Sequence, residues 1–177
     1  FLTALSRLLR AEGIETRCFA AAAVLLDSLD RNSRGCVVAD LEMPEVSGFE
    51  LQQRLTASPA PMPIVFLTGY GDIPGSVRAM QQGAVDFLEK RAPREVLMRA
   101  IRSGLARGEE EFRARSRRAS LIELFSRLTS REIQVLGHVV EGRMNKEIAY
   151  ELQIHERTVK LHRTSITRKL GVHSTAQ

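Results

Sequence analysis

Cysteine is scarce in this sequence, and long hydrophobic runs are missing. The 177 residues include two cysteines, with 44% hydrophobic and 27% charged residues. No apolar stretch approaches the roughly 20 residues that a membrane-spanning helix needs, and there is no basic-then-apolar leader. We therefore expect a soluble, cytoplasmic protein with no membrane partner. Cys18 and Cys36 lie in apolar, strand-like runs without histidine at a ligand spacing, which predicts two reduced core thiols.

The sequence also lacks an initiating methionine and an acidic pair ahead of its first helix. Residue 1 is Phe, and Leu2, Leu5 and Leu9 already follow helical spacing. This pattern leads us to expect that the amino end is truncated.

Positive and negative charges are distributed unevenly along the chain. Up to Glu110 there are 13 Lys and Arg against 14 Asp and Glu, and from Glu111 onward the counts are 13 and 7. A basic carboxyl-terminal third suggests a nucleic-acid partner for that end alone. We expect a domain over residues 1–108, a helical linker over 109–127 and a second domain over 128–177.

Residues 1–108 alternate strand-like and helix-like segments. After the opening helix we expect strands over 14–19, 36–39, 63–67 and 84–88, with helices over 20–29, 46–57 and 73–82 between them. The runs at 36–39 and 63–67 are apolar without alternation, which is typical of strands buried on both faces of a parallel sheet. The pattern predicts an α/β fold with a doubly wound parallel sheet and right-handed crossovers.

Three of these strands end on polar side chains, Asp40, Thr68 and Lys90. If the strands are neighbours, a carboxylate, a hydroxyl and an ammonium meet at one rim of the sheet. This trio suits a phosphoryl group, because the carboxylate can attack phosphorus while the ammonium and the hydroxyl bind its oxygens. Such an attack also needs a divalent cation, for which the backbone carbonyl of Glu42 is one candidate ligand. Taken singly, Asp40 is more often a turn former or helix cap.

The residues around this trio carry a family resemblance. Met43-Pro44 and Gly48 follow Asp40, and the run from Gly83 to Phe87 precedes Lys90. With these residues the first domain resembles the receiver domain of two-component response regulators. Within them it is similar to the StyR/FixJ-like receivers of the NarL/FixJ family. The resemblance implies a flavodoxin-like sheet with its first strand missing. It also implies four roles: phosphoacceptor for Asp40, phosphate-binding hydroxyl for Thr68, switch aromatic for Phe87 and phosphate partner for Lys90.

Two features depart from that family. Its Mg²⁺ site uses two acidic residues after the first strand, which are absent here, so Asp40 and the Glu42 carbonyl would hold Mg²⁺ weakly or not at all. The family usually has proline after the lysine, with a cis bond, where this chain has Arg91. A cis Lys90–Arg91 bond would cost about 3 kcal/mol, so we expect a strained or differently arranged loop.

The stretch after residue 93 has two possible arrangements. An amphipathic helix that covers the sheet can continue to Phe125, supported by pairs such as Glu109 with Arg113. Against continuity, Gly104 and Gly108 would each cost about 1 kcal/mol in a helix interior. We interpret the basic run at 113–118 as a solvated linker face rather than a DNA-contacting arm.

The second domain opens with a capping box. Thr129 and Glu132 have the spacing that starts a helix, whose apolar face we predict to be Ile133, Leu136 and Val140. A second helix over 146–152, capped by Asn145, and a third over 156–170 would follow. Two short helices joined by a tight turn, the second basic on its exposed face, form a helix-turn-helix that fits a DNA major groove.

The motifs of this domain resemble those of LuxR-type DNA-binding domains. They are Leu128-Thr-x-Arg-Glu, Asn145-Lys-Glu-Ile-Ala and Thr158-Val-Lys-x-His, followed by Lys169-Leu170. The resemblance implies base contacts near Lys160, Leu161 and Thr164. The full implied DNA-binding set is Asn145, Lys146, Arg157, Lys160, Leu161, Arg163, Thr164 and Lys169.

Two further expectations concern the ends of helices in this domain. His155 stands where the family often has serine as the cap of the recognition helix, and histidine caps less well, so this helix start should fray. The family's dimer contact is a fourth helix, which would begin near Ser174. Because the sequence stops at Gln177, we expect truncation there and poor dimerisation of the chain as given.

Together these features predict a DNA-binding transcriptional response regulator that is not an enzyme. A sensor histidine kinase would phosphorylate Asp40, and the intact phosphorylated protein would bind promoter DNA as a homodimer. One alternative is a phosphatase of the haloacid dehalogenase type, although Glu42 does not serve as the second aspartate that it requires. The other is a constitutive DNA-binding protein whose receiver makes only protein contacts.

Overall fold

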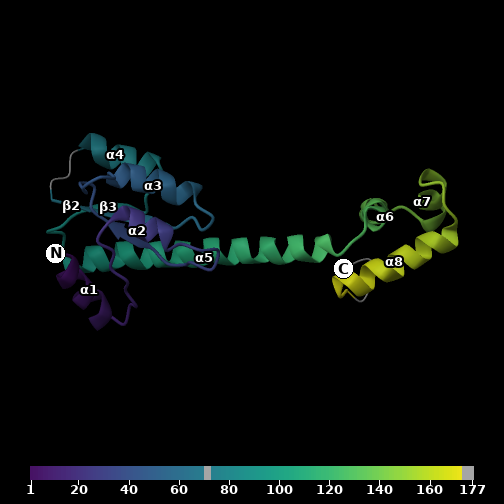
Figure 1. Ribbon diagram of the computed structural model, residues 1–177, viewed down its shortest axis with the longest axis horizontal. Helices are drawn as coiled ribbons and strands as arrows, with labels where there is room; N and C mark the ends of the chain where they lie inside the picture. Colours follow the sequence, from purple (N-terminus) through teal and green to yellow (C-terminus); the bar gives the residue numbers. More distant parts are fainter. Residues whose placement is uncertain (70–72, 173–177) are drawn as a thin grey trace. The chain divides into compact units, whose positions relative to one another are not determined.

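The computed structural model describes residues 1–69 and 73–172 (Figure 1). It divides the chain into two compact units, Phe1–Ala114 and Arg115–Gln177. Each unit is described by itself below.

The first unit is an α/β structure around a parallel sheet. Three strands, β1 (Val37–Ala39), β2 (Ile64–Thr68) and β3 (Asp86–Glu89), pair in the order β1-β2-β3. The register sets Val38 opposite Val65, and Phe66 opposite Phe87. The helices are α1 (Leu2–Ala11), α2 (Ala22–Asp27), α3 (Gly48–Ala57), α4 (Ile73–Gln81) and α5 (Arg94–Ser126).

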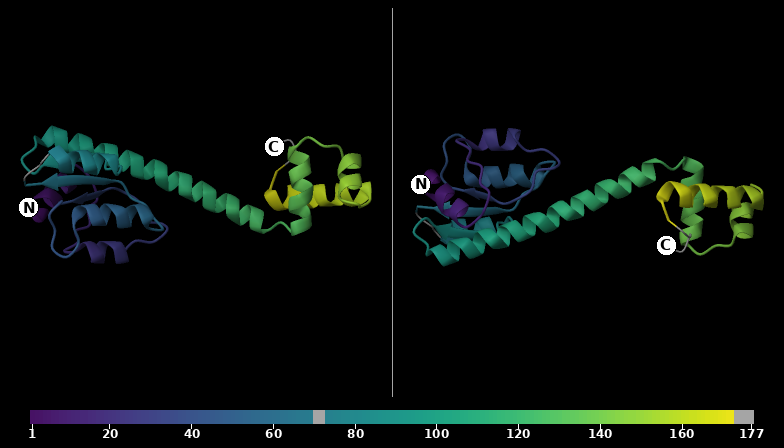
Figure 2. Two further views of the ribbon diagram at one scale, coloured as in Figure 1. Left: turned by 90° about the horizontal axis from the view of Figure 1, so that it is seen from above. Right: turned by 90° about the horizontal axis from the view of Figure 1, so that it is seen from below.

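Helices cover both faces of the sheet, as the sequence predicts. Ala39, Ile64 and Phe66 pack with buried residues of α2, α3 and α4, whereas Val38 packs with α1 and α5. Side chains alternate between the faces of a strand, so odd and even positions of β1 belong to different clusters. Figures 1 and 2 show the sheet between α5 on one side and α2 and α3 on the other.

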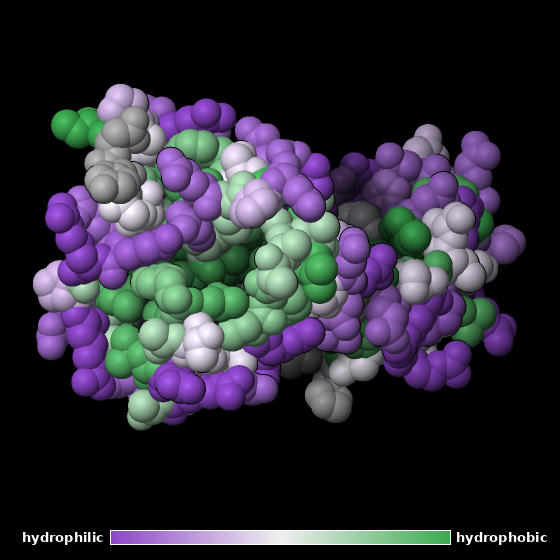
Figure 3. Space-filling view, turned by 60° about the vertical axis from the view of Figure 1, so that its left-hand side comes forward, coloured by the Kyte–Doolittle hydropathy of each residue, from purple (hydrophilic) through white to green (hydrophobic). Residues whose placement is uncertain are grey.

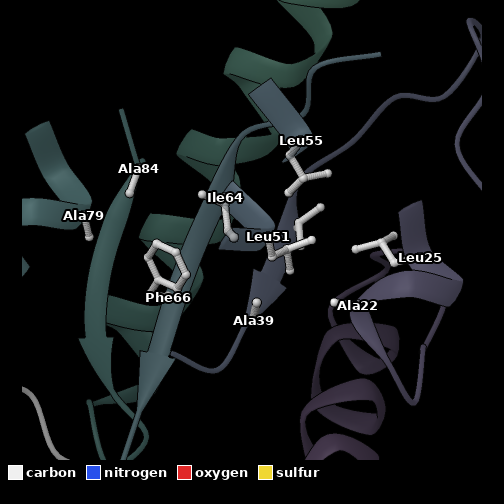
Figure 4. Packing of buried hydrophobic residues seen from close by; sticks show 10 residues of the cluster. Ala22, Leu25, Ala39, Leu51, Leu55, Ile64, Phe66, Ala79 and Ala84 are labelled. Carbon is white, nitrogen blue, oxygen red and sulfur yellow. The ribbon is translucent and has the colours of Figure 1, made fainter. Parts of the chain in front are cut away.

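The larger core lies under α2 and α3. Figure 4 shows Ile64 and Phe66 on one face of β2, with Leu51 and Leu55 of α3 beside them. Leu51, Leu55, Ile64 and Phe66 are all at most 2% exposed. In the space-filling view, hydrophobic residues of the first unit gather in a hollow bordered by hydrophilic ones (Figure 3).

The predicted strand over residues 14–19 is wrong. This segment forms no strand and pairs with none of the three strands of the sheet. The burial of both cysteines is also only partly correct. Cys18, within that segment, is exposed, and Cys36 is half-buried. Burial nonetheless raises the pKa of the Cys36 thiol to about 12.

The long helix α5 runs without interruption through both of its interior glycines. A Cβ atom on Gly104 would lie 2.4 Å from the Cys36 sulfur, and one on Gly108 would lie 2.1 Å from the Gly35 carbonyl oxygen. The two glycines therefore allow α5 to approach the start of β1 closely. This packing offsets their low helix propensity, and the arrangement with one continuous helix is the one observed.

The second unit packs α6 (Ser130–Val140), α7 (Asn145–Glu151) and α8 (Glu156–Leu170) around one small core. Val135, Ile148 and Val159 are fully buried at its centre. The capping box is present, since Thr129 accepts from the Glu132 backbone and Glu132 accepts from the Thr129 backbone. The boundaries of α8 match the predicted range.

Two details of this unit differ from the prediction. The buried face of α6 carries Glu132 and Val135, while Ile133 and Val140 are 50% and 80% exposed. The predicted and the observed buried positions both have helical spacing. The observed set includes a glutamate, a residue type that a sequence pattern assigns to the surface. Asn145 is the first residue of α7 rather than its cap. The backbone N–H of Met144 instead donates to Glu147 over 2.8 Å.

Candidate functional site

The carboxyl ends of the three strands bring the predicted rim residues together. Asp40 directly follows β1, Thr68 ends β2 and Lys90 directly follows β3. Because β2 lies between β1 and β3, Thr68 occupies the middle of this rim. The Lys90 backbone N–H donates to the Thr68 carbonyl over 2.8 Å, which joins the two strand ends.

Asp40 is held by two contacts of different kinds. The Lys90 ammonium donates to its Oδ2 in an ion pair whose side chains are 33% and 26% exposed for Lys90 and Asp40. The backbone N–H of Glu42 donates to Oδ1 over 3.2 Å. The carboxylate is therefore oriented yet reachable from solvent, and an ammonium stands beside it. This combination suits a nucleophile that receives an anionic group.

The remaining rim residues have contrasting environments. Thr68 is 2% exposed, so its side chain belongs to the floor of the rim. Phe87 is half-buried, and its ring lies 6.2 Å from that of Phe66, which lies 6.1 Å from that of Phe49. The Arg78 guanidinium of α4 sits 4.3 Å above the Phe49 ring. An aromatic row thus connects β3 with α3 and α4.

The loop after β3 has an ordinary backbone. All described peptide bonds are trans, including Lys90–Arg91. Arg91 forms an ion pair with Glu89 at the exposed surface. Lys90 reaches Asp40 without the cis bond that is usual in the resembled family, so the loop is arranged differently rather than strained.

The described residues do not complete a metal site. Receiver domains typically bind Mg²⁺ for phosphorylation, and Asp40 with the Glu42 carbonyl can supply part of such a site. Over residues 1–69 and 73–172, however, no three His, Cys, Asp or Glu side chains lie close enough together to hold a metal ion. The same described residues include no helix long and apolar enough to cross a membrane.

The second unit presents a basic helix face. Successive residues of a helix are rotated by about 100°, so positions 157, 161, 164 and 168 of α8 share one face, with 160 at its border. These positions are exposed, and the Leu161 side chain is 65% exposed. The predicted residues Arg157, Lys160, Leu161 and Thr164 therefore gather on one surface. Arg168, which the implied DNA-binding set does not include, lies on the same exposed face.

The other four predicted DNA-binding residues, Asn145, Lys146, Arg163 and Lys169, have partners or positions away from this face. Arg163 donates to the Asn145 side-chain oxygen over 2.8 Å, and the Lys169 ammonium lies 2.6 Å from Glu132 Oε2. Lys146 is exposed near the start of α7. His155 precedes α8 without a side-chain capping bond, as expected. The predicted fourth helix near Ser174 lies outside the described residues.

Glu132 is a functional candidate that sequence reasoning treated only as a cap. Its side chain is 5% exposed. The bond from Lys169, with smaller contributions from Thr129 and Ser165, lowers the pKa of Glu132 from 4.5 to about 2. Arg131, its neighbour, donates to the Leu152 carbonyl over 2.6 Å and so links α6 to the end of α7. The one sequence signal that could have suggested this ion pair is the position of Glu132 next to the buried face of α6.

Comparisons with known proteins identify both units. Residues 1–102 match the response regulator receiver domain, and residues 126–177 match the bacterial regulatory proteins of the luxR family. The chain is 42% identical over 173 residues to the response regulator protein TodT of Pseudomonas putida F1, covering 98% of this chain and 76% of TodT. It is 39% identical over 170 residues to the transcriptional regulatory protein FixJ of Azorhizobium caulinodans, covering 96% and 81%.

Solved structures agree with this assignment. The response regulator StyR superposes with a TM-score of 0.87 at 46% identity, covering 99% of this chain and 88% of StyR. Full-length FixJ from B. japonicum gives a TM-score of 0.56 at 36% identity, covering 98% and 86%. These relatives exclude the phosphatase alternative. The chain belongs to the two-component response regulators with a LuxR-type output domain, and it is a DNA-binding transcription regulator rather than an enzyme.

Proposed function

We propose that Asp40 is the phosphoacceptor of this regulator and that its phosphorylation controls DNA binding by the second unit. The observation that supports this proposal is the Lys90–Asp40 ion pair at the partly exposed rim. A sensor histidine kinase, the partner that the family implies, would supply the phosphoryl group. The working boundaries are a receiver over residues 1–108, a linker over 109–127 and a DNA-binding domain over 128–177.

The chemistry follows from the two oxygens of Asp40. One oxygen attacks the phosphorus of a phosphohistidine, the phosphorus–nitrogen bond breaks, and the imidazole leaves with its electron pair and takes up a proton. The product is an acyl phosphate on Asp40. The Lys90 ammonium, already bonded to the carboxylate, would then neutralise a phosphoryl oxygen. The other Asp40 oxygen keeps the backbone bond from Glu42, which holds the carboxylate in place.

A change at the phosphorylation site can be transmitted from β3 to α4. Phosphorylation adds charge and acceptor oxygens, to which the Thr68 hydroxyl would turn, and Phe87 would move into the space released. The row from Phe87 through Phe66 to Phe49 and Arg78 supports this role, because it continues from β3 to α4. The proposal includes Mg²⁺ as the metal of the intact protein, dimerisation after phosphorylation, and a cytoplasmic location.

For the output, we propose that Lys160, Leu161 and Thr164 read base edges. They lie on or at the border of one exposed face of α8. Arg157, with Asn145 and Lys146 at the start of α7, would contact phosphates. The half-buried position of His162 supports a packing role for its ring beside the turn.

An acyl-phosphate assay tests the receiver proposal. The intact protein and its Asp40→Asn variant are incubated with Mg²⁺ and a phosphoramidate donor, and base-labile phosphate is measured together with DNA affinity. Asp27→Asn, an exposed position in α2, is the matched control. We expect Asp40→Asn to lose all stable labelling and the phosphorylation-dependent gain in affinity, and Asp27→Asn to lose neither. Unchanged labelling in Asp40→Asn would show that another residue accepts the phosphate, and an unmodified protein that binds DNA without being labelled would favour the constitutive DNA-binding protein.

A further inference from the structure

Two residues of α8 stand apart from its DNA-facing surface. Taking 100° per residue, Arg163 and Lys169 lie about 120° to either side of the face formed by Arg157, Leu161 and Thr164. They also lie six positions apart in the sequence, which corresponds to about 9 Å along the helix axis. The two basic side chains therefore flank the helix at two levels and on opposite sides.

Each of these side chains contacts a different neighbouring helix. Lys169 bonds Glu132 of α6 over 2.6 Å, and Arg163 bonds Asn145 of α7 over 2.8 Å. Glu132 Oε2 also accepts from the Thr129 backbone over 2.7 Å and from the Thr129 hydroxyl over 3.0 Å. The cap of α6 and the C-terminal half of α8 thus share one buried carboxylate.

This carboxylate is an unusual choice for a core position of so small a domain. Burying an ionic pair commonly gives no more stability than packing apolar side chains of the same size. An ion pair does, however, restrict the geometry of the elements that it joins, since its charges tolerate few alternative positions. Base reading requires that kind of restriction, because contact residues must be held within about 0.5 Å of their productive positions.

We propose that Lys169 and Arg163 are positioning residues, which fix the rotation of α8 about its own axis so that Lys160, Leu161 and Thr164 face the groove. The proposal rests on the DNA-binding function and revises two of the predicted DNA contacts. Glu132 and Asn145 are the anchors. Neither the Lys169–Glu132 ion pair nor the Arg163–Asn145 hydrogen bond needs to touch DNA for sequence discrimination to depend on it.

The salt dependence of DNA binding separates positioning from phosphate contact. A side chain that neutralises one phosphate contributes about 0.9 to the slope of log K against log salt concentration. A positioning residue contributes nothing to that slope but affects the ratio of affinities for specific and random DNA. Loss of folded protein lowers both affinities by the same factor, so the ratio does not change through instability alone.

The test uses the intact protein and two duplexes of equal length, one selected from a randomised library by the unmodified protein and one of random sequence. The variants are Lys169→Met and Glu132→Gln. Glutamine keeps the acceptor for the Thr129 backbone and removes the charge that binds Lys169. Arg168→Met, on the exposed face of α8, is the control.

We expect Lys169→Met and Glu132→Gln each to lower the ratio of affinities for specific and random DNA about tenfold, which corresponds to the cost of one mismatched base pair. The slope of log K against log salt concentration should not change. The double variant should be no worse than either single one. Arg168→Met should weaken both duplexes alike and reduce the slope by about 0.9. A reduced slope in Lys169→Met, or an unchanged ratio in Glu132→Gln, would overturn the positioning role. If the unmodified protein prefers no duplex, DNA reading itself is wrong; failure of the Asp40 switch leaves all these results unaffected.

Discussion

We assign a functional role to one lysine–carboxylate pair in each unit of this chain, and the surroundings of the two pairs differ. Lys90 and Asp40 meet at the end of the sheet, with side chains that are 33% and 26% exposed. Lys169 and Glu132 meet inside the second unit, where the Glu132 side chain is 5% exposed and receives further bonds from Thr129. In the first pair both partners are partly exposed, whereas in the second the carboxylate is buried and its lysine is 28% exposed.

The difference shows how one chemical pair serves two purposes. A pair near solvent contributes little to stability, so a phosphoryl group can replace one of its contacts at small cost. A pair in the interior cannot lose a partner without leaving an uncompensated charge, so it acts as a fixed structural link. On this view the receiver pair is made to be rearranged, and the pair in the DNA-binding unit is made to persist.

The largest expected effect follows from removing the carboxylate of each pair. Glu132→Ala should lower the free energy of unfolding by about 3 kcal/mol, because it leaves Lys169 unpaired and removes half of the capping box. Asp40→Asn should change it by about 1 kcal/mol or less. Urea unfolding of both variants, followed by circular dichroism, measures the two values. Equal losses would show that the two pairs do not differ in the way described.

A pH series gives a second reading of the same pair. The pKa of Glu132 is lowered from 4.5 to about 2, so the folded state favours its ionised form. Its contribution to stability is therefore complete above pH 4.5 and is lost as the pH falls toward 2. Glu132→Gln should remove this part of the acid sensitivity, which the difference between the two unfolding curves isolates. A constant difference across that range would contradict the assignment.

The next effect compares one glycine of each unit. Gly108→Ala should destabilise the first unit by about 2 kcal/mol, because the new methyl group would meet the Gly35 carbonyl oxygen at 2.1 Å. Gly137→Ala, in α6 with nothing within 4 Å, should instead stabilise the second unit by about 1 kcal/mol. Thermal unfolding of the two variants tests for opposite signs. Stabilisation by Gly108→Ala would mean that α5 does not need to approach β1 closely.

These glycines also show where sequence reasoning reached its limit. The strand ends at Asp40, Thr68 and Lys90 were predictable, because apolar runs and polar termini are local signals. Gly104 and Gly108 argued against a continuous helix, since helix propensity takes no account of what packs beside the backbone. The close approach to Gly35 and Cys36 is a tertiary contact that no local pattern contains.

Burial of a charged side chain caused one further error. Leu136 packs against the core as predicted, but the other two residues of the predicted apolar face of α6 do not, since Ile133 is 50% and Val140 80% exposed. Glu132, a residue type usually found at the surface, is 4% exposed. Lys169 belongs to the predicted DNA-binding set, and its bond to Glu132 is the reason we propose a positioning role for it instead. Only the fold brings a carboxylate 37 positions away to its ammonium.

The smallest expected effect concerns the two ends of α8. Its C-terminal half is joined to α6 by Lys169, but its first turn begins at His155, whose side chain makes no capping bond although its backbone angles of −68° and 145° suit a cap. His155→Ser should therefore add about 0.5–1 kcal/mol of stability by giving the N–H groups of the first turn a side-chain acceptor. His155→Ala should add nothing, and hydrogen exchange of the first-turn amides measures the difference. If serine leaves that exchange unchanged, contacts farther along α8, including the Glu132–Lys169 pair, already hold its first turn in place.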